Sequence, residues 1–179
     1  MDLPKRKPTR LKNYDYSTDG YYFITICTHN KRKILCDIVG EGLCALPQRT
    51  NPTEREGTET LPYCALPYIK LTAIGETVKK SIEFVHENYD NIFVDKYVIM
   101  PNHVHLIIQK QTGGHGGPPL QIYNVIGNFK SFTTRKYGKT LWQRSFHDHI
   151  IRGEKDYLEI WNYIDTNPQK WETDCFYAP

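Results

Sequence analysis

Hydrophobic positions along the chain recur with two different periods, and the change of period predicts the order of the elements. Alternating or continuous runs rich in aromatic and β-branched residues predict extended segments at 21–28, 92–100, 103–109 and 141–152. Spacings of three and four residues predict amphipathic helices at 72–89, 122–138 and 154–167. Gly138 suits the C-terminal cap of the second helix, and Pro168 ends the third.

Each predicted helix has one apolar side. In the first it consists of residues 74, 78, 82 and 85. In the second it consists of Ile122, Val125, Ile126, Phe129 and Phe132. In the third it consists of Tyr157, Ile160, Trp161 and Ile164. These sides are expected to pack against a sheet.

The order strand, helix, hairpin, helix, strand, helix predicts an α+β fold with a ferredoxin-like β-α-β-β-α-β core. We expect an antiparallel sheet with helices on one face and an open second face. Residues 1–179 are interpreted as one domain. Residues 40–67 contain four prolines and many polar residues, and they are interpreted as an inserted loop or hairpin.

Composition narrows the class of protein. No apolar run approaches the roughly 18 residues needed to cross a bilayer, and no signal-type segment follows the basic N-terminus. A cytoplasmic protein with no membrane partner is therefore expected. The five cysteines include no Cys-x-x-Cys pair, which predicts reduced thiols.

The net charge of +3 hides a strong asymmetry, because no Asp or Glu occurs between Lys96 and His147. Such segregation favours phosphate binding, although a solvated face and a loose tail would look the same. The candidate DNA-binding residues in the acid-free part are Lys130, Arg135, Lys136 and Arg144. Those in the basic arm, residues 1–12, are Lys5, Arg6, Lys7 and Arg10.

Two histidines stand one residue apart in the apolar run VIMPNHVHLIIQ. Because side chains alternate along a strand, His103 and His105 share one face, with Cα atoms about 6–7 Å apart. Two imidazoles in this arrangement are able to converge on one metal ion. Alternatively, they hydrogen-bond on a solvated sheet face.

The last predicted helix carries a second, mostly polar stripe of Asp156, Glu159, Tyr163 and Asn167. The Asn167 amide lies one turn from Tyr163 on the same side. An asparagine carbonyl is a suitable oxygen ligand, and a tyrosine hydroxyl beside a metal-bound phosphate is a potential nucleophile.

Three blocks taken together resemble a known family. YVIMPNHVHLII, LWQRSFHDHIIR and KDYLEIWNYIDTNP, in that order, resemble the HUH single-tyrosine (Y1) transposases of the IS200/IS605-like superfamily. Among these, the chain looks most like the REP-associated tyrosine transposases. The N-terminal NYDYSTDGYYFITICTHNKRKIL fits the same group, whereas residues 40–67 do not belong to its pattern.

The resemblance implies a role for individual residues. His103 and His105 would be metal ligands, Asn167 the third ligand, and Tyr163 the nucleophile. His149 would be a site-adjacent residue rather than a ligand, and His147 a surface or DNA-facing residue. The implied ion is Mg²⁺ or Mn²⁺, although such ligands would also hold Zn²⁺ or Ni²⁺.

The resemblance also implies a reaction and a partner. Tyr163 would attack a phosphodiester of single-stranded DNA near a REP-like hairpin and form a 5′-phosphotyrosine that a second 3′-hydroxyl reverses. The protein would act as a monomer or homodimer. Three alternatives remain: a catalytically silent hairpin-binding module, a metal-dependent phosphodiesterase that uses water, and a ferredoxin-like domain with structural histidines.

Overall fold

The computed structural model describes residues 18–40, 67–111 and 121–177, and all structural statements below concern these residues. Four strands form one antiparallel sheet in the order β4-β5-β1-β6. Their bounds are Gly20–Cys27 for β1, Ile92–Met100 for β4, His103–Lys110 for β5 and His147–Ile151 for β6. With helices α1 (Ala73–Asn88) and α2 (Ile122–Tyr137), they make the predicted ferredoxin-like core.

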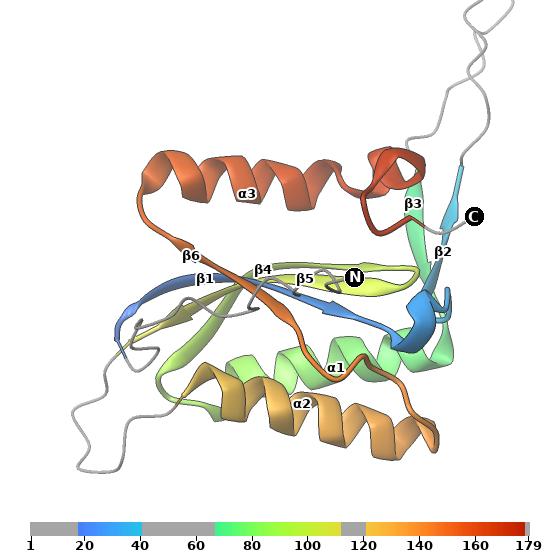
Figure 1. Ribbon diagram of the computed structural model, residues 1–179, viewed down its shortest axis with the longest axis horizontal. Coiled ribbons are helices and arrows are strands. Elements are labelled where there is room, and N and C mark those ends of the chain that lie inside the picture. The colour runs from blue at the N-terminus through green and yellow to red at the C-terminus, as the bar shows by residue number, and fades with distance from the viewer. Residues whose placement is uncertain (1–17, 41–66, 112–120, 178–179) are drawn as a thin grey trace, which may run out of the picture.

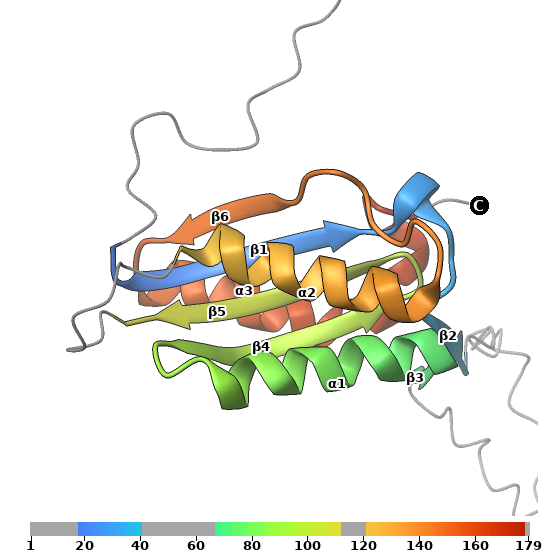
Figure 2. The same cartoon turned by 90° about the horizontal axis from the view of Figure 1, so that it is seen from below.

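The sheet separates two layers of helices (Figure 1). Helices α1 and α2 cover one face (Figure 2), where they enclose the larger core around Tyr22, Val104 and Leu106. Helix α3 (Glu154–Thr166) covers the other face, which contains Met100 and Ile107, and a short 3₁₀ helix (Pro168–Thr173) follows it. The expectation of an open second face was therefore wrong, because half-buried aromatic side chains of α3 pack onto it.

The helix boundaries follow from local chemistry. Thr72 caps α1, and its hydroxyl oxygen accepts a hydrogen bond from the backbone N–H of Gly75. Gly138 ends α2 with a φ of 75°, in the left-handed region that glycine tolerates. The three predicted helices agree with the structure to within one residue at each end.

The predicted apolar side of α2 contains one error. Its first four members, Ile122, Val125, Ile126 and Phe129, are buried in the core, but Phe132 is exposed. Phe132 lies beyond the width of the buried stripe and points into the space beside α1, where it lines a groove. The period of a helix indicates which side faces a layer, but not where that layer ends.

A two-stranded ribbon of β2 (Cys36–Val39) and β3 (Tyr68–Leu71) was not predicted. It pairs the residues on either side of the 41–66 segment. Most of the predicted insertion at 40–67, and the basic arm at 1–12, lie outside the described residues.

The described parts of the chain contain no helix that is long and apolar enough to cross a membrane. Among the same residues, Cys27, Cys36 and Cys175 are free thiols. Burial raises the pKa of Cys27 to about 11 and that of Cys36 to about 12, so both remain protonated.

Candidate active site

His103 and His105 lie on β5, on the sheet face covered by α3, and both are buried with at most 1% of their surface exposed. The alternation of the strand places Val104 and Leu106 in the opposite core. The ring centroids of His103 and His105 are 4.4 Å apart. The predicted shared face is thus observed, but it is a buried face and not a solvated one.

Hydrogen bonds at Nδ1 orient both imidazole rings. Nδ1 of His103 lies 2.8 Å from Oδ1 of Asn102, and Nδ1 of His105 lies 2.8 Å from Oγ1 of Thr25. The Asn102 oxygen is an acceptor only, so His103 carries its proton on Nδ1 and leaves the Nε2 lone pair available. Nε2 of His103 is buried without a hydrogen-bond partner.

Burial keeps both rings neutral. Desolvation, with a smaller contribution from Lys31, lowers the pKa of His103 to about 3. Desolvation and the neighbouring His103 lower the pKa of His105 well below its usual value. Neutral imidazole is the form that binds a metal ion.

Tyr163 and Asn167 approach the histidines from the C-terminal end of α3. The Tyr163 hydroxyl oxygen lies 3.3 Å from Nε2 of His105, and Asn167 is buried with its Oδ1 unpartnered. The stripe predicted as the polar side of this helix therefore faces the sheet at these two positions. This explains why a tyrosine occurs on it.

Asp174 is part of the site, and sequence reasoning missed it. Its Oδ2 accepts hydrogen bonds from the Tyr163 hydroxyl at 3.0 Å and from the Asn167 amide at 2.7 Å. One ligand atom from each of His103, His105 and Asp174 lies within 4.8 Å of the others. Asp174 follows the 3₁₀ helix, in a segment without periodicity, so no sequence pattern indicated its position.

Phe176 covers the site from the same segment. Its ring centroid lies 4.7 Å from that of His103 and 5.7 Å from that of His105, and its carbonyl accepts a hydrogen bond from the Asn102 amide at 2.9 Å.

Burial, together with the negative charge of Asp174, raises the pKa of Tyr163 well above its usual value. In this arrangement the phenol is neutral.

The donor set suits a divalent cation. The neutral imidazoles of His103 and His105 and the Asp174 carboxylate converge. The Asn167 amide is hydrogen-bonded to that carboxylate, and His103 Nε2 and Asn167 Oδ1 are buried without a hydrogen-bond partner. Buried polar atoms are normally satisfied, so these two unpartnered acceptors are available to a bound cation. Mixed nitrogen and oxygen ligands are compatible with Mn²⁺, Mg²⁺ and Zn²⁺.

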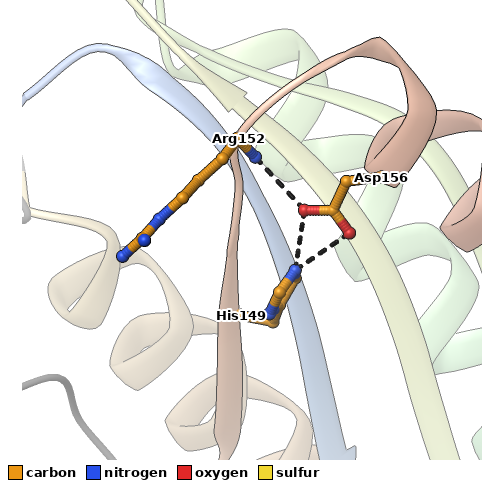
Figure 3. Close-up of polar contacts among 3 residues, drawn as sticks. All are labelled: His149, Arg152 and Asp156. Atoms are coloured by element: carbon orange, nitrogen blue, oxygen red, sulfur yellow. Dashed lines mark hydrogen bonds and ion pairs between the residues drawn. The ribbon is translucent and has the colours of Figure 1, made fainter.

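His149 lies on β6 and faces α3, where Figure 3 shows it beside Asp156 and Arg152. Its Nε2 lies 2.9 Å from Oδ2 and 3.1 Å from Oδ1 of Asp156, and Oδ2 also accepts a hydrogen bond from the backbone N–H of Arg152. In the strand register His149 is opposite Phe23, and the Phe23 ring stacks on His105 at 5.1 Å. Phe23 thus connects His149 to the candidate ligand His105, and His149 is not itself one of the candidate ligands.

The candidate DNA-binding residues differ in their environments. Arg135, Lys136 and Arg144 are exposed, whereas the Lys130 ammonium donates to the carbonyls of Gln143 and Arg144. Lys130 therefore also holds the loop that follows α2, and burial lowers its pKa. The four basic residues of the arm, Lys5, Arg6, Lys7 and Arg10, lie outside the described residues.

A known protein is similar in sequence to this chain over most of its length. No family model matches the chain. An uncharacterized protein of Haemophilus influenzae (strain ATCC 51907 / DSM 11121 / KW20 / Rd) is 32% identical over 194 residues, which cover 97% of this chain and 93% of the relative. The chain belongs to the family of this Haemophilus protein.

A solved structure is similar to this chain in its fold. The REP-associated tyrosine transposase bound to a REP hairpin superimposes with a TM-score of 0.59 and 19% identity, over 90% of this chain and 74% of that chain. At this identity the match concerns the fold. The expected α+β, ferredoxin-like architecture with a C-terminal helix is confirmed, and it is the fold of a tyrosine transposase.

Proposed function

We propose that the protein is a metal-dependent transposase-type enzyme that cleaves and rejoins single-stranded DNA with Tyr163 as its nucleophile. The contact between the Tyr163 hydroxyl and His105 Nε2, at 3.3 Å, carries this proposal. It places a phenol beside a pair of buried, neutral imidazoles, on a fold shared with a REP-associated tyrosine transposase.

His103, His105 and an oxygen from Asn167 or Asp174 would hold the cation. Mg²⁺ or Mn²⁺ bound there would polarise the scissile phosphate and hold it in line with the attacking oxygen. The contribution of the chain is positional: Asn102 and Thr25 fix the ring orientations, and the Phe176 ring packs beside His103.

The proton of Tyr163 has a defined acceptor. Asp174 Oδ2 lies 3.0 Å from the hydroxyl oxygen, within the range for general-base transfer. As the bond between the phenolic oxygen and phosphorus forms, the proton passes to Asp174. The bond from phosphorus to the 3′ oxygen breaks, and that oxygen leaves as a hydroxyl by taking up, through water, the proton that Asp174 releases. Reversal by a 3′-hydroxyl rejoins a strand.

The DNA partner is proposed to be a hairpin with a single-stranded flank. The solved relative with this fold is bound to a REP hairpin. On this chain the exposed Arg135, Lys136 and Arg144 offer positive charge for phosphates. The basic arm at 1–12 adds further positive charge.

A denaturing gel tests the proposal. The protein is incubated with Mn²⁺ and a hairpin oligonucleotide. The label is placed on the part of the strand that keeps the 5′-phosphate after cleavage. Label that migrates with the protein, and is lost in Tyr163→Phe, supports strand transfer. Tyr157→Phe is the matched control, because Tyr157 is on the same helix but its hydroxyl donates to Asp95. Free cleaved DNA without adduct would identify a hydrolase, and a gel shift without cleavage would identify a binding module.

A further inference from the structure

A groove of about 460 Å³ lies between α1 and α2, on the sheet face opposite to the histidines. Its floor is formed by the buried Ser81, Val85 and Phe129. Two phenylalanines on its walls are exposed to an unusual degree, 58% for Phe84 and 43% for Phe132. Lone exposed apolar residues are ordinary, but two phenylalanines that flank one groove indicate a binding surface.

The charged side chains that line the groove are of one sign. Among the described residues, its lining includes Lys80 and Arg135 but no Asp or Glu. The Lys136 ammonium adds a third positive charge, 5.7 Å from the centre of the Phe132 ring. Flat aromatic faces next to cations, without acids, are the combination that unpaired bases and their phosphates require.

The groove continues toward the candidate active site. A second hollow, lined by Lys130, Trp142 and Arg144, shares Ser131 and Arg135 with it. The neighbouring Gln143 donates its backbone N–H to the carbonyl of Cys27 at 2.9 Å, and Cys27 is the strand partner of His103. This surface therefore leads from the groove to the end of the sheet where the histidines lie.

We propose that the α1–α2 groove binds unpaired nucleotides of a single-stranded DNA, with bases stacked on Phe84 and Phe132 and phosphates on Lys80 and Arg135. The groove is a binding surface separate from the metal site, on the other side of the sheet. The same strand would pass over Arg135 and Arg144 to reach the cleavage site.

The experiment measures fluorescence anisotropy of a labelled oligo-dT of about 12 nucleotides, within the range that one domain covers. It is done in EDTA with Tyr163→Phe as the parent protein, so that no cleavage occurs. The result does not depend on the chemistry of Tyr163. Failure of this inference leaves the cleavage reaction untouched, and failure of cleavage leaves the groove untouched.

Phe84→Ala and Phe132→Ala are each expected to weaken binding about 5- to 150-fold, the loss of one stacked base. Leu158→Ala removes an equally exposed apolar side chain, 56% exposed, from α3 on the other face and should change nothing. Phe132→Tyr retains an aromatic face and should bind like the parent. Circular dichroism checks that each variant is folded.

Two further comparisons separate stacking from charge. An abasic strand of the same length should bind the parent weakly and should lose no further affinity in the phenylalanine variants. Lys80→Gln and Arg135→Gln should each reduce the slope of log affinity against log salt by about 0.7.

Three results would overturn the inference. The first is unchanged dT binding in both phenylalanine variants, and the second is an equal loss of affinity for dT and for the abasic strand. The third is a sedimentation measurement in which Phe84→Ala abolishes self-association while dT binding stays the same. That result would assign the groove to a second copy of the chain.

Discussion

The hydroxyl of Tyr163 lies between two groups of opposite character, with His105 Nε2 at 3.3 Å and an Asp174 carboxylate oxygen at 3.0 Å. The first contact connects the last helix to the central hairpin, across 58 residues of sequence. The contact with Asp174 connects the last helix to the segment that follows it. The phenol, the histidines and a proton acceptor thus meet at one point, although the hairpin with the histidines is far from the last helix in the chain.

Removal of one imidazole should abolish tight binding of Mn²⁺. His103→Ala leaves His105, Asn167 and Asp174, and we expect the dissociation constant to rise by at least about 10-fold. Isothermal titration calorimetry of metal-free protein measures it. His86→Ala is the control, because His86 lies on α1 on the opposite side of the sheet. Equal affinities in the wild type and His103→Ala would remove His103 from the ligand set.

Acid should destabilise the metal-free protein through its buried histidines. The pKa of His103 is about 3 in the folded state, against an ordinary value of 6.5. Between these values the unfolded state binds a proton that the folded state does not, so the free energy of unfolding falls as the pH decreases from 6.5 towards 3. At pH 5 the loss due to His103 is about 2 kcal/mol.

Urea unfolding in EDTA between pH 8 and pH 4 measures this loss. His103→Gln removes the titrating group and should flatten the profile, whereas the exposed His29 replaced by Gln should leave it unchanged. Parallel profiles for the wild type and His103→Gln would contradict a buried neutral imidazole at this position.

Two helical glycines should respond in opposite directions to alanine. A Cβ at Gly75 would meet the carbonyl oxygen of Leu35 at 2.0 Å, so Gly75→Ala forces α1 away from the backbone and should cost about 2 kcal/mol or more. A Cβ at Gly127, within α2, would meet nothing within 4 Å. Gly127→Ala should therefore stabilise the protein by about 0.5–1 kcal/mol. Thermal unfolding distinguishes them, and a similar change in both would contradict the close approach of α1 to Leu35.

The periodicity of the sequence was sufficient for the main elements, because their apolar positions pack against a layer. The helix from Ala73 to Asn88 buries Val78, Ile82 and Val85, as its spacing indicates. The period of two on β5 likewise placed His103 and His105 on one face. The ribbon of β2 and β3 escaped prediction because each strand has four residues, too few to show a period.

The site was only partly predictable. Tyr163 stood out as an aromatic residue on a polar stripe, Asn167 as an amide one turn further along it, and the resemblance gave both of them roles. Asp174 could not be found in this way, because its position depends on the turn after Pro168 and on no repeating pattern. The exposure of Phe132 depends on the distance between α1 and α2, which is a tertiary property.

The residue that carries the DNA after cleavage tests the central claim most directly. Protein incubated with Mn²⁺ and a single-stranded hairpin is digested with trypsin and nuclease, and the peptide bearing the residual nucleotide is sequenced by mass spectrometry. The account predicts a phosphodiester on the hydroxyl of Tyr163. A nucleotide on any other residue, or cleaved DNA with no modified peptide, would contradict it.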